Sequence, residues 1–229
     1  MKLTEPQIQQ LYTFTQKHYV DWYDVQTELV DHLANGIESH LEENPKTTFE
    51  SALNSEFKKF GIMGFNDVIE EKTKALNRYY RKLIWTYLKG FFKLPKIIFT
   101  VLLIWAYYEL LIMFSNRLWV IAPTAFLLFA IPIWQIYKQS QKIKSIKKDT
   151  NKKWLFDNIV LQLGGLIHFL NIVIQIGFFN RSGIWSPKAN LILSVFIVLF
   201  SLTLYIALYI VSPKLRKDMA KQHPEYKFI

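Results

Sequence analysis

The stretch KIIFTVLLIWAYYELLIMF, residues 96–114, decides the fold class of this chain. After its first lysine it holds a single charged residue, Glu109, and it is long enough to cross a hydrocarbon core of about 30 Å as a helix. Similar stretches follow, and the predicted spans run over residues 94–114, 118–137, 155–179 and 189–211. The sequence therefore predicts an all-α protein with a four-helix transmembrane bundle.

The distribution of Lys and Arg predicts the orientation of these spans. Residues 72–96 carry eight basic residues, residues 138–153 carry seven, and the tail from residue 214 carries five, whereas the other two connections carry three in all. Basic connections stay on the cytosolic side of a membrane. We therefore expect both termini and the Lys-rich loop in the cytosol.

The residues before the first span predict a small helical domain. Val25, Leu29, Leu33, Ile37 and Leu41 recur at steps of four and form one apolar stripe. The predicted organisation is an acidic cytosolic domain at residues 1–65, a basic juxtamembrane helix at 66–93, a transmembrane domain at 94–212 and a cytosolic tail at 213–229.

Charge is segregated along the chain. Residues 1–71 contain thirteen acidic residues against five lysines, and the remainder contains twenty-three basic residues against five acidic ones. Anionic lipid repels an acidic surface, so this surface either meets a protein partner or folds onto the Lys-rich loop. The candidates for partner binding are the acidic residues of the second predicted helix: Glu28, Asp31, Glu38, Glu42 and Glu43.

The loop KQSQKIKSIKKDTNKK, residues 138–153, lies between two predicted spans. This position favours attraction to anionic headgroups over nucleic-acid binding, and we expect no nucleic-acid partner. The expected lipid contacts are its lysines: Lys138, Lys142, Lys144, Lys147, Lys148, Lys152 and Lys153.

The run YDVQTELVDHLANGIESHLEENPKTTFESALNSEFKKFG resembles the helical modules called HAAS or permease-prefix domains, which precede membrane segments in many bacterial proteins. The shared features are an ELxDHL-like core at residues 28–33, a Pro-containing turn, an FxxAL helix at residues 49–53 and a closing FG. Such modules belong to membrane-bound regulators and permease subunits. The resemblance covers about residues 20–65 and brings no catalytic residue. It implies a bacterial inner-membrane protein, and the whole chain resembles four-span proteins of Bacteroidota-type bacteria.

A polar cluster is predicted inside the membrane. Glu109 lies deep in the first span, and an isolated carboxylate there is costly unless it is paired or neutralised. Its expected partners lie on the third predicted span, which carries His168, Asn171 and Gln175 at helical spacing. The favoured interpretation is hydrogen-bonded glue between helices, and the alternative is a proton or ion pathway.

Motifs that would indicate catalysis are missing from the sequence. There is no phosphate loop, nucleophile elbow or cysteine, and the group Glu28, Asp31, His32 and His40 lacks an established metal-ligand spacing. We expect no enzyme, cofactor or metal. The predicted function is a non-catalytic interaction or regulatory subunit of a membrane complex, and the alternative is a small transporter component that uses the region of Glu109 and His168.

Overall fold

The computed structural model describes residues 2–162 and 186–226, and its described elements are helices without any strand. The chain divides into two compact units. The N-terminal unit contains residues 1–76 and 149–158, and the membrane unit contains residues 77–148 and 159–229. The boundary between the units at residues 76 and 77 therefore lies inside the predicted juxtamembrane helix, residues 66–93. Residues 149–158, which are distant in sequence, belong to the N-terminal unit.

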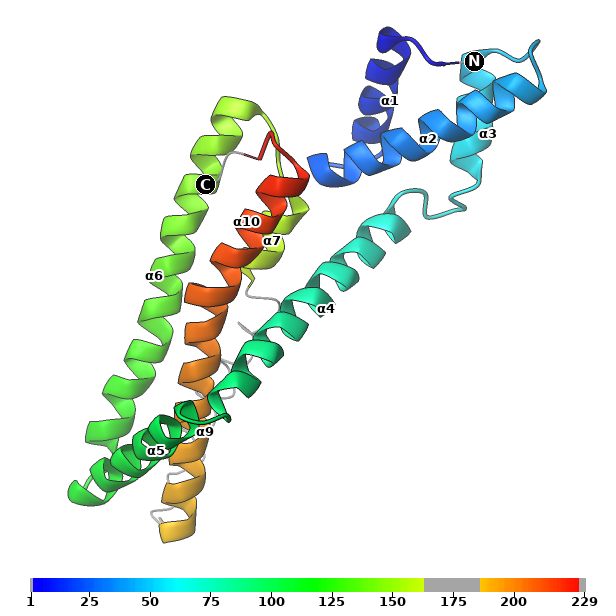
Figure 1. The fold of residues 1–229 in the computed structure, drawn as a ribbon. Coiled ribbons are helices and arrows are strands. Elements are labelled where there is room, and N and C mark those ends of the chain that lie inside the picture. Colours follow the sequence, from blue (N-terminus) through cyan, green and yellow to red (C-terminus); the bar gives the residue numbers. More distant parts are fainter. Residues whose placement is uncertain (1, 163–185, 227–229) are drawn as a thin grey trace. The chain divides into compact units, whose positions relative to one another are not determined.

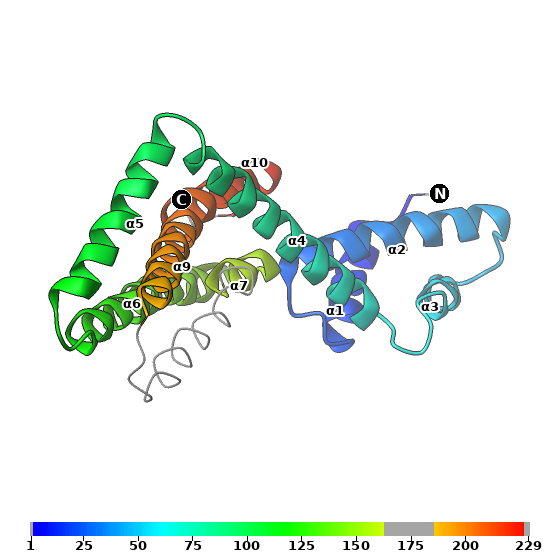
Figure 2. The ribbon, with the colours of Figure 1, turned by 90° about the horizontal axis from the view of Figure 1, so that it is seen from below.

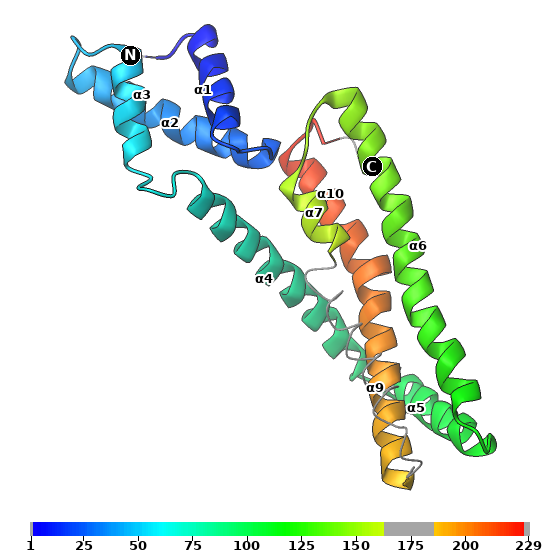
Figure 3. The ribbon, with the colours of Figure 1, turned by 180° about the vertical axis from the view of Figure 1, so that it is seen from behind.

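The N-terminal unit is built on three helices, α1 (Glu5–Lys17), α2 (Tyr23–Glu43) and α3 (Phe49–Lys58). Thr4 and Gln7 form a capping box at the start of α1, and the Thr48 side chain accepts a bond from the Ser51 N–H at the start of α3. Figures 1 and 3 show α1 and α3 crossing α2 and running in the same direction as each other. Helix α2 contains the whole apolar stripe expected from Val25 to Leu41.

The apolar stripe of α2 forms the core of this unit. Leu33 and Ile37 are fully buried, and Leu29 is nearly so. At Gly36 the side chain of Glu56 from α3 lies so close that an added Cβ would stand 2.5 Å from its Oε2. Glycine therefore allows α3 to approach the backbone of α2 at this point.

The membrane unit contains the second half of α4 (Asn66–Phe91), then α5 (Lys96–Met113), α6 (Leu118–Thr150), α9 (Pro187–Tyr205) and α10 (Ser212–Gln222). Among the described residues, three helices are long and apolar enough to cross a membrane, at residues 96–113, 118–150 and 187–222. The most apolar part of the last is 56% buried, against 11% in each of the others. Helix α9 is thus the central helix, between α5 and α6 in Figure 2.

Helix α6 extends far beyond the predicted second span. It continues for 33 residues, through Pro123 and Pro132 and through most of the Lys-rich loop (Figure 3). At 1.5 Å per residue this is about 50 Å, more than the hydrocarbon core of about 30 Å. The lysines of this loop therefore lie on a helix.

The last apolar helix continues past Pro213, which follows the predicted fourth span. A π-helical turn, η3 (Ile206–Val211), joins α9 to α10. Pro213 has no N–H to donate to the Tyr209 carbonyl, four residues before it. In the π turn, the Ser212 N–H donates to the Ala207 carbonyl, five residues before it. The Ser212 hydroxyl also donates to that carbonyl, at 2.7 Å.

Tyr80 of α4 packs onto this π turn. Its side chain is 1% exposed, and its hydroxyl lies 3.1 Å from the Ala207 carbonyl oxygen and 3.0 Å from the Ser212 Oγ. Burial raises the pKa of Tyr80 to about 12, so this hydroxyl stays a donor. The basic helix predicted at residues 66–93 is therefore fastened to the end of the last apolar helix.

The predicted third span, residues 155–179, lies mostly outside the described residues. The structure describes its beginning as α7 (Leu155–Leu161). The membrane association expected from the sequence agrees with the three apolar helices. Four spans and cytosolic termini stay predictions.

Candidate functional site: a clasp on helix α2

The segment Lys152–Leu155 binds the beginning of α2 within the N-terminal unit. We call this contact the clasp, and define it as Asp21, Tyr23 and Asp24 with residues 152–155. Its two sides are more than 120 residues apart in sequence. It fastens the beginning of the third predicted span, together with the residues just before it, to the helical unit.

Backbone, charge and ring contacts act together in the clasp. The Tyr23 N–H donates to the Lys153 carbonyl at 2.7 Å, and the Lys153 ammonium lies 2.8 Å from Asp21 Oδ2. The Tyr23 ring stacks edge-on against Trp154, with 5.3 Å between centroids, and the Lys152 ammonium lies 3.7 Å from the centroid of the Tyr23 ring. Tyr23 therefore contributes both its backbone and its ring.

Asp24 is the buried centre of the clasp. It is 2% exposed, and its Oδ1 accepts a bond from the Leu155 N–H at 3.0 Å. The first N–H groups of a helix lack partners within it, so Asp24 acts as a cap for α7 supplied by another helix. Burial raises the pKa of Asp24 from its value of 3.8, opposed by the N–H groups of Leu155 and Phe156 and by the Lys72 charge.

Apolar packing completes the attachment. Leu155 is 2% exposed and belongs to the core of the N-terminal unit, together with Leu29 and Val25. Trp154 is 3% exposed. An exposed ion pair such as Asp21 with Lys153 contributes little alone, so the apolar contacts and the buried hydrogen bond hold the clasp closed.

Lys72 of α4 joins the same end of α2 from another direction. Its ammonium donates to the Asp24 carbonyl at 3.0 Å and pairs with the Glu28 carboxylate. The beginning of α2 therefore contacts both the helix that leads to the first span and the segment that leads to the third.

The predicted partner-binding residues of α2 separate into two groups. Glu28 pairs with Lys72, and half-buried Glu38 accepts the Leu3 N–H at 2.8 Å. Glu28 is itself exposed, as are Asp31, Glu42 and Glu43. The part of the exposed acidic surface that lies outside the Lys72 contact is therefore Asp31, Glu42 and Glu43.

The predicted lipid-contact lysines also separate. Lys152 and Lys153 belong to the clasp, which corresponds to the expected alternative that the acidic helices fold onto the Lys-rich loop. The remaining five lie exposed along α6: Lys138, Lys142, Lys144, Lys147 and Lys148. Lys138 lies 5.7 Å from the centroid of the Trp134 ring.

Glu109 is exposed on α5 and forms no hydrogen bond or ion pair with any described residue. Its expected partners His168, Asn171 and Gln175 lie outside the described residues. The intramembrane cluster therefore stays a prediction.

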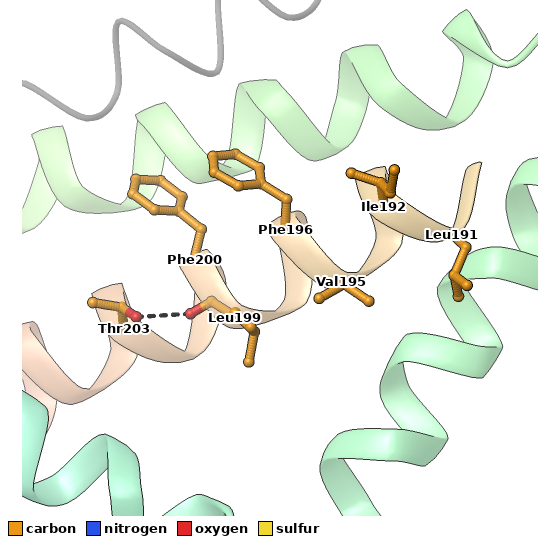
Figure 4. A pocket seen from close by; sticks show the side chains of 7 residues that line it. All are labelled: Leu191, Ile192, Val195, Phe196, Leu199, Phe200 and Thr203. Carbon is orange, nitrogen blue, oxygen red and sulfur yellow. Dashed lines mark hydrogen bonds between the residues drawn. The ribbon is translucent and has the colours of Figure 1, made fainter. Parts of the chain in front are cut away.

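One face of α9 carries an apolar groove of about 580 Å³. Figure 4 shows its lining, which consists of Leu191, Ile192, Val195, Phe196, Leu199, Phe200 and Thr203. The Thr203 hydroxyl donates to the Leu199 carbonyl of the same helix at 2.8 Å. The described residues that line the groove are apolar apart from Thr203.

Among the described residues, no group of three or more His, Asp or Glu side chains is placed to hold a metal ion. His32, one of the residues considered for a metal, stands edge-on to the Phe60 ring at 5.7 Å between centroids.

Comparison of the chain with protein-family models, curated proteins and solved structures finds no match.

Sequence reasoning missed the clasp because its halves show no shared pattern. Asp21 and Asp24 flank the beginning of a predicted helix, where acidic residues are common, and Trp154 resembles an interfacial anchor. The available signal was charge: two lysines end the Lys-rich loop, and two aspartates begin the acidic helix.

Proposed function

We propose that this chain is a non-catalytic, membrane-anchored interaction or regulatory protein of a bacterial inner membrane, with four spans and both termini in the cytosol. The supporting observation is the clasp, in which buried Leu155 and the Asp24 cap make the beginning of the third predicted span part of the helical unit. A partner that binds this unit could thereby act on the membrane helices.

The proposed partner surface is the exposed acidic part of α2, with Asp31, Glu42 and Glu43. A partner with a basic docking surface fits it, because opposite charges steer association and fix register. Helix α2 carries both this surface and the clasp. Binding would therefore favour one of two arrangements, with residues 152–155 attached or released.

Purification of the tagged full chain from native membranes tests the partner. We expect a protein to be recovered in stoichiometric amount and lost in the double variant Asp31→Lys with Glu43→Lys. The matched control is Glu50→Lys at an exposed position of α3, which makes the same type of charge reversal outside the proposed surface. Recovery of the chain alone, or equal loss in the control, would contradict the proposed surface.

Cysteine labelling tests the orientation separately, since the chain contains no cysteine. Ser115 lies exposed between α5 and α6, and Ser145 lies exposed on the Lys-rich part of α6. In intact cells, a membrane-impermeant maleimide should label Ser115→Cys and spare Ser145→Cys. The opposite pattern would place the N-terminal unit outside the cytosol.

A further inference from the structure

The N-terminal unit exposes three large apolar side chains at one end. Tyr19 is 86% exposed, Met63 is 59% exposed and Ile62 is fully exposed. Ile62 and Met63 form the loop between α3 and α4, and Tyr19 follows α1. Helices α1 and α3 run in the same direction (Figures 1 and 3), so these residues follow helix ends on the same side of the unit.

A shared aromatic cluster supports the two segments. The His18 ring is tilted against the Phe57 ring with 4.4 Å between centroids. The Phe65 ring lies about 5 Å, between centroids, from the rings of both Phe57 and Phe60. His18 immediately precedes Tyr19, and Phe60 and Phe65 flank the Ile62–Met63 loop. The exposed residues therefore project from a packed base.

The backbone conformation of Tyr19 indicates that its side chain does not serve packing within the unit. Tyr19 has φ +64, and its N–H and that of Val20 bond to Gln16 and Thr15 in the pattern that normally ends a helix with glycine. A tyrosine in this left-handed conformation is disfavoured, and its exposed ring makes no compensating contact. The stability of the unit does not explain tyrosine here.

The charges around this end differ from those of the rest of the unit. Lys17, Lys58 and Lys59 end α1 and α3, and they are three of the five lysines in residues 1–71. The acidic residues nearest along the chain are Asp21, which pairs with Lys153, Glu56, which pairs with Lys59, and Asp67 in the first turn of α4. This end is free of the acidic surplus that would oppose an anionic surface.

We propose that Tyr19, Ile62 and Met63 form a membrane-inserting tip, whose apolar side chains enter the headgroup region of the bilayer beside Lys17 and Lys58. A lipid surface is the fitting occupant, because the unit is part of a chain with apolar membrane helices and the tip combines exposed apolar residues with lysines. This contact is independent of the proposed partner surface on α2.

The test uses the full chain in lipid nanodiscs that contain one part anionic lipid to about two parts neutral lipid, a composition chosen to attract lysines. Met63→Cys provides a single attachment point for an environment-sensitive fluorophore, since the chain has no other cysteine. We expect blue-shifted emission, quenching by headgroup-proximal nitroxide lipid and resistance to aqueous iodide. Asn54→Cys, at an exposed position of α3, is the matched control, and a fluorophore attached there should behave as a probe in water.

A second variant tests the insertion energy. Ile62→Ser in the Met63→Cys background should lower nitroxide quenching about twofold or more, because an apolar side chain no longer enters the bilayer. Ile62 contacts nothing in the unit, so helicity by circular dichroism should stay unchanged. A Met63 probe as accessible to iodide as the Asn54 probe would overturn the proposal. So would protection from both quenchers, which would indicate a protein contact.

Discussion

The two units place large apolar side chains in opposite ways. In the N-terminal unit such residues are buried along one face of each helix, and only three are exposed among the described residues. On α5 alone eight are exposed. A unit surrounded by water minimises exposed apolar surface, whereas lipid tails solvate it without cost. An exposed apolar side chain is therefore unfavourable in the N-terminal unit and ordinary on a helix that faces lipid. The exposure of Tyr19, Ile62 and Met63 requires an explanation, and the exposure of the apolar residues of α5 does not.

The largest expected effect is a charge in the water-surrounded core. Leu33→Asp should destabilise the N-terminal unit by about 4 kcal/mol or more, because it creates a void and buries an unpaired carboxylate. Hydrogen exchange of the full chain in detergent measures this, with loss of protection in α1 to α3. The control Asn35→Asp, at an exposed position two residues further along the same helix, should change stability by less than about 0.5 kcal/mol. Retained protection in Leu33→Asp would contradict the observed core.

The next effect tests whether residues 149–158 belong to the N-terminal unit. A fragment of residues 1–76 is small and should be only marginally stable. Joining residues 149–158 to it through a Gly-Ser linker should add about 2–3 kcal/mol, because Trp154 and Leu155 become buried. Urea denaturation followed by circular dichroism measures the difference. The same fusion with Leu155→Ser should lose most of the gain, and equal midpoints for all three would mean that the clasp contributes nothing.

A smaller effect concerns the buried charge of the clasp. Asp24→Ala should cost about 1–2 kcal/mol, because the Leu155 N–H loses its acceptor. Asp24→Asn keeps an acceptor oxygen and should cost less than about 0.5 kcal/mol at neutral pH. Denaturation of the fused fragment compares the two. An Asn variant as damaged as the Ala variant would show that the negative charge itself is required.

The pH dependence of the same pair sharpens the test. Burial raises the pKa of Asp24 above 3.8 in the folded state, so the folded state binds this proton more tightly than the unfolded state. The contribution of Asp24 to stability should therefore fall as pH rises from 3.8 through the folded-state pKa. Asp24→Asn should lack this part of the slope, and identical slopes in both proteins would contradict it.

The smallest effect lies in the membrane unit. Tyr80→Phe should cost about 1 kcal/mol, because the hydroxyl bond is lost while Ser212 still bonds to the Ala207 carbonyl. Thermal unfolding in detergent measures it, with exposed Tyr79→Phe as the neutral control. Since the pKa of Tyr80 is raised to about 12, its contribution should be complete below pH 10 and fall as pH rises through 12. No difference between the two variants would mean that the bond does not stabilise the π turn.

Local pattern carried most of the helix prediction. The steps of four from Val25 to Leu41, the Thr48 cap and the proline at position 45 are local features of the chain: α2 contains the stripe and ends at Glu43, and α3 begins directly after Thr48. Helix α6 exceeded its predicted bound because hydropathy reports where lipid ends, and a polar lysine-rich sequence continues a helix equally well. Pro213 follows the predicted fourth span but does not end the last apolar helix, which continues through the π turn into α10.

The sequence by itself determined the helical class, the apolar membrane segments and the apolar face of each N-terminal helix, because hydrophobic periodicity and capping act between near neighbours. Only the tertiary structure decided that Asp24 caps Leu155, that Tyr80 rests on the π turn, and that the α3–α4 loop exposes Ile62. Each of these depends on segments brought together by packing, and the polar partners are separated by more than 120 residues. A buried carboxylate and an exposed isoleucine carry no local signal, since their surroundings are created by folding.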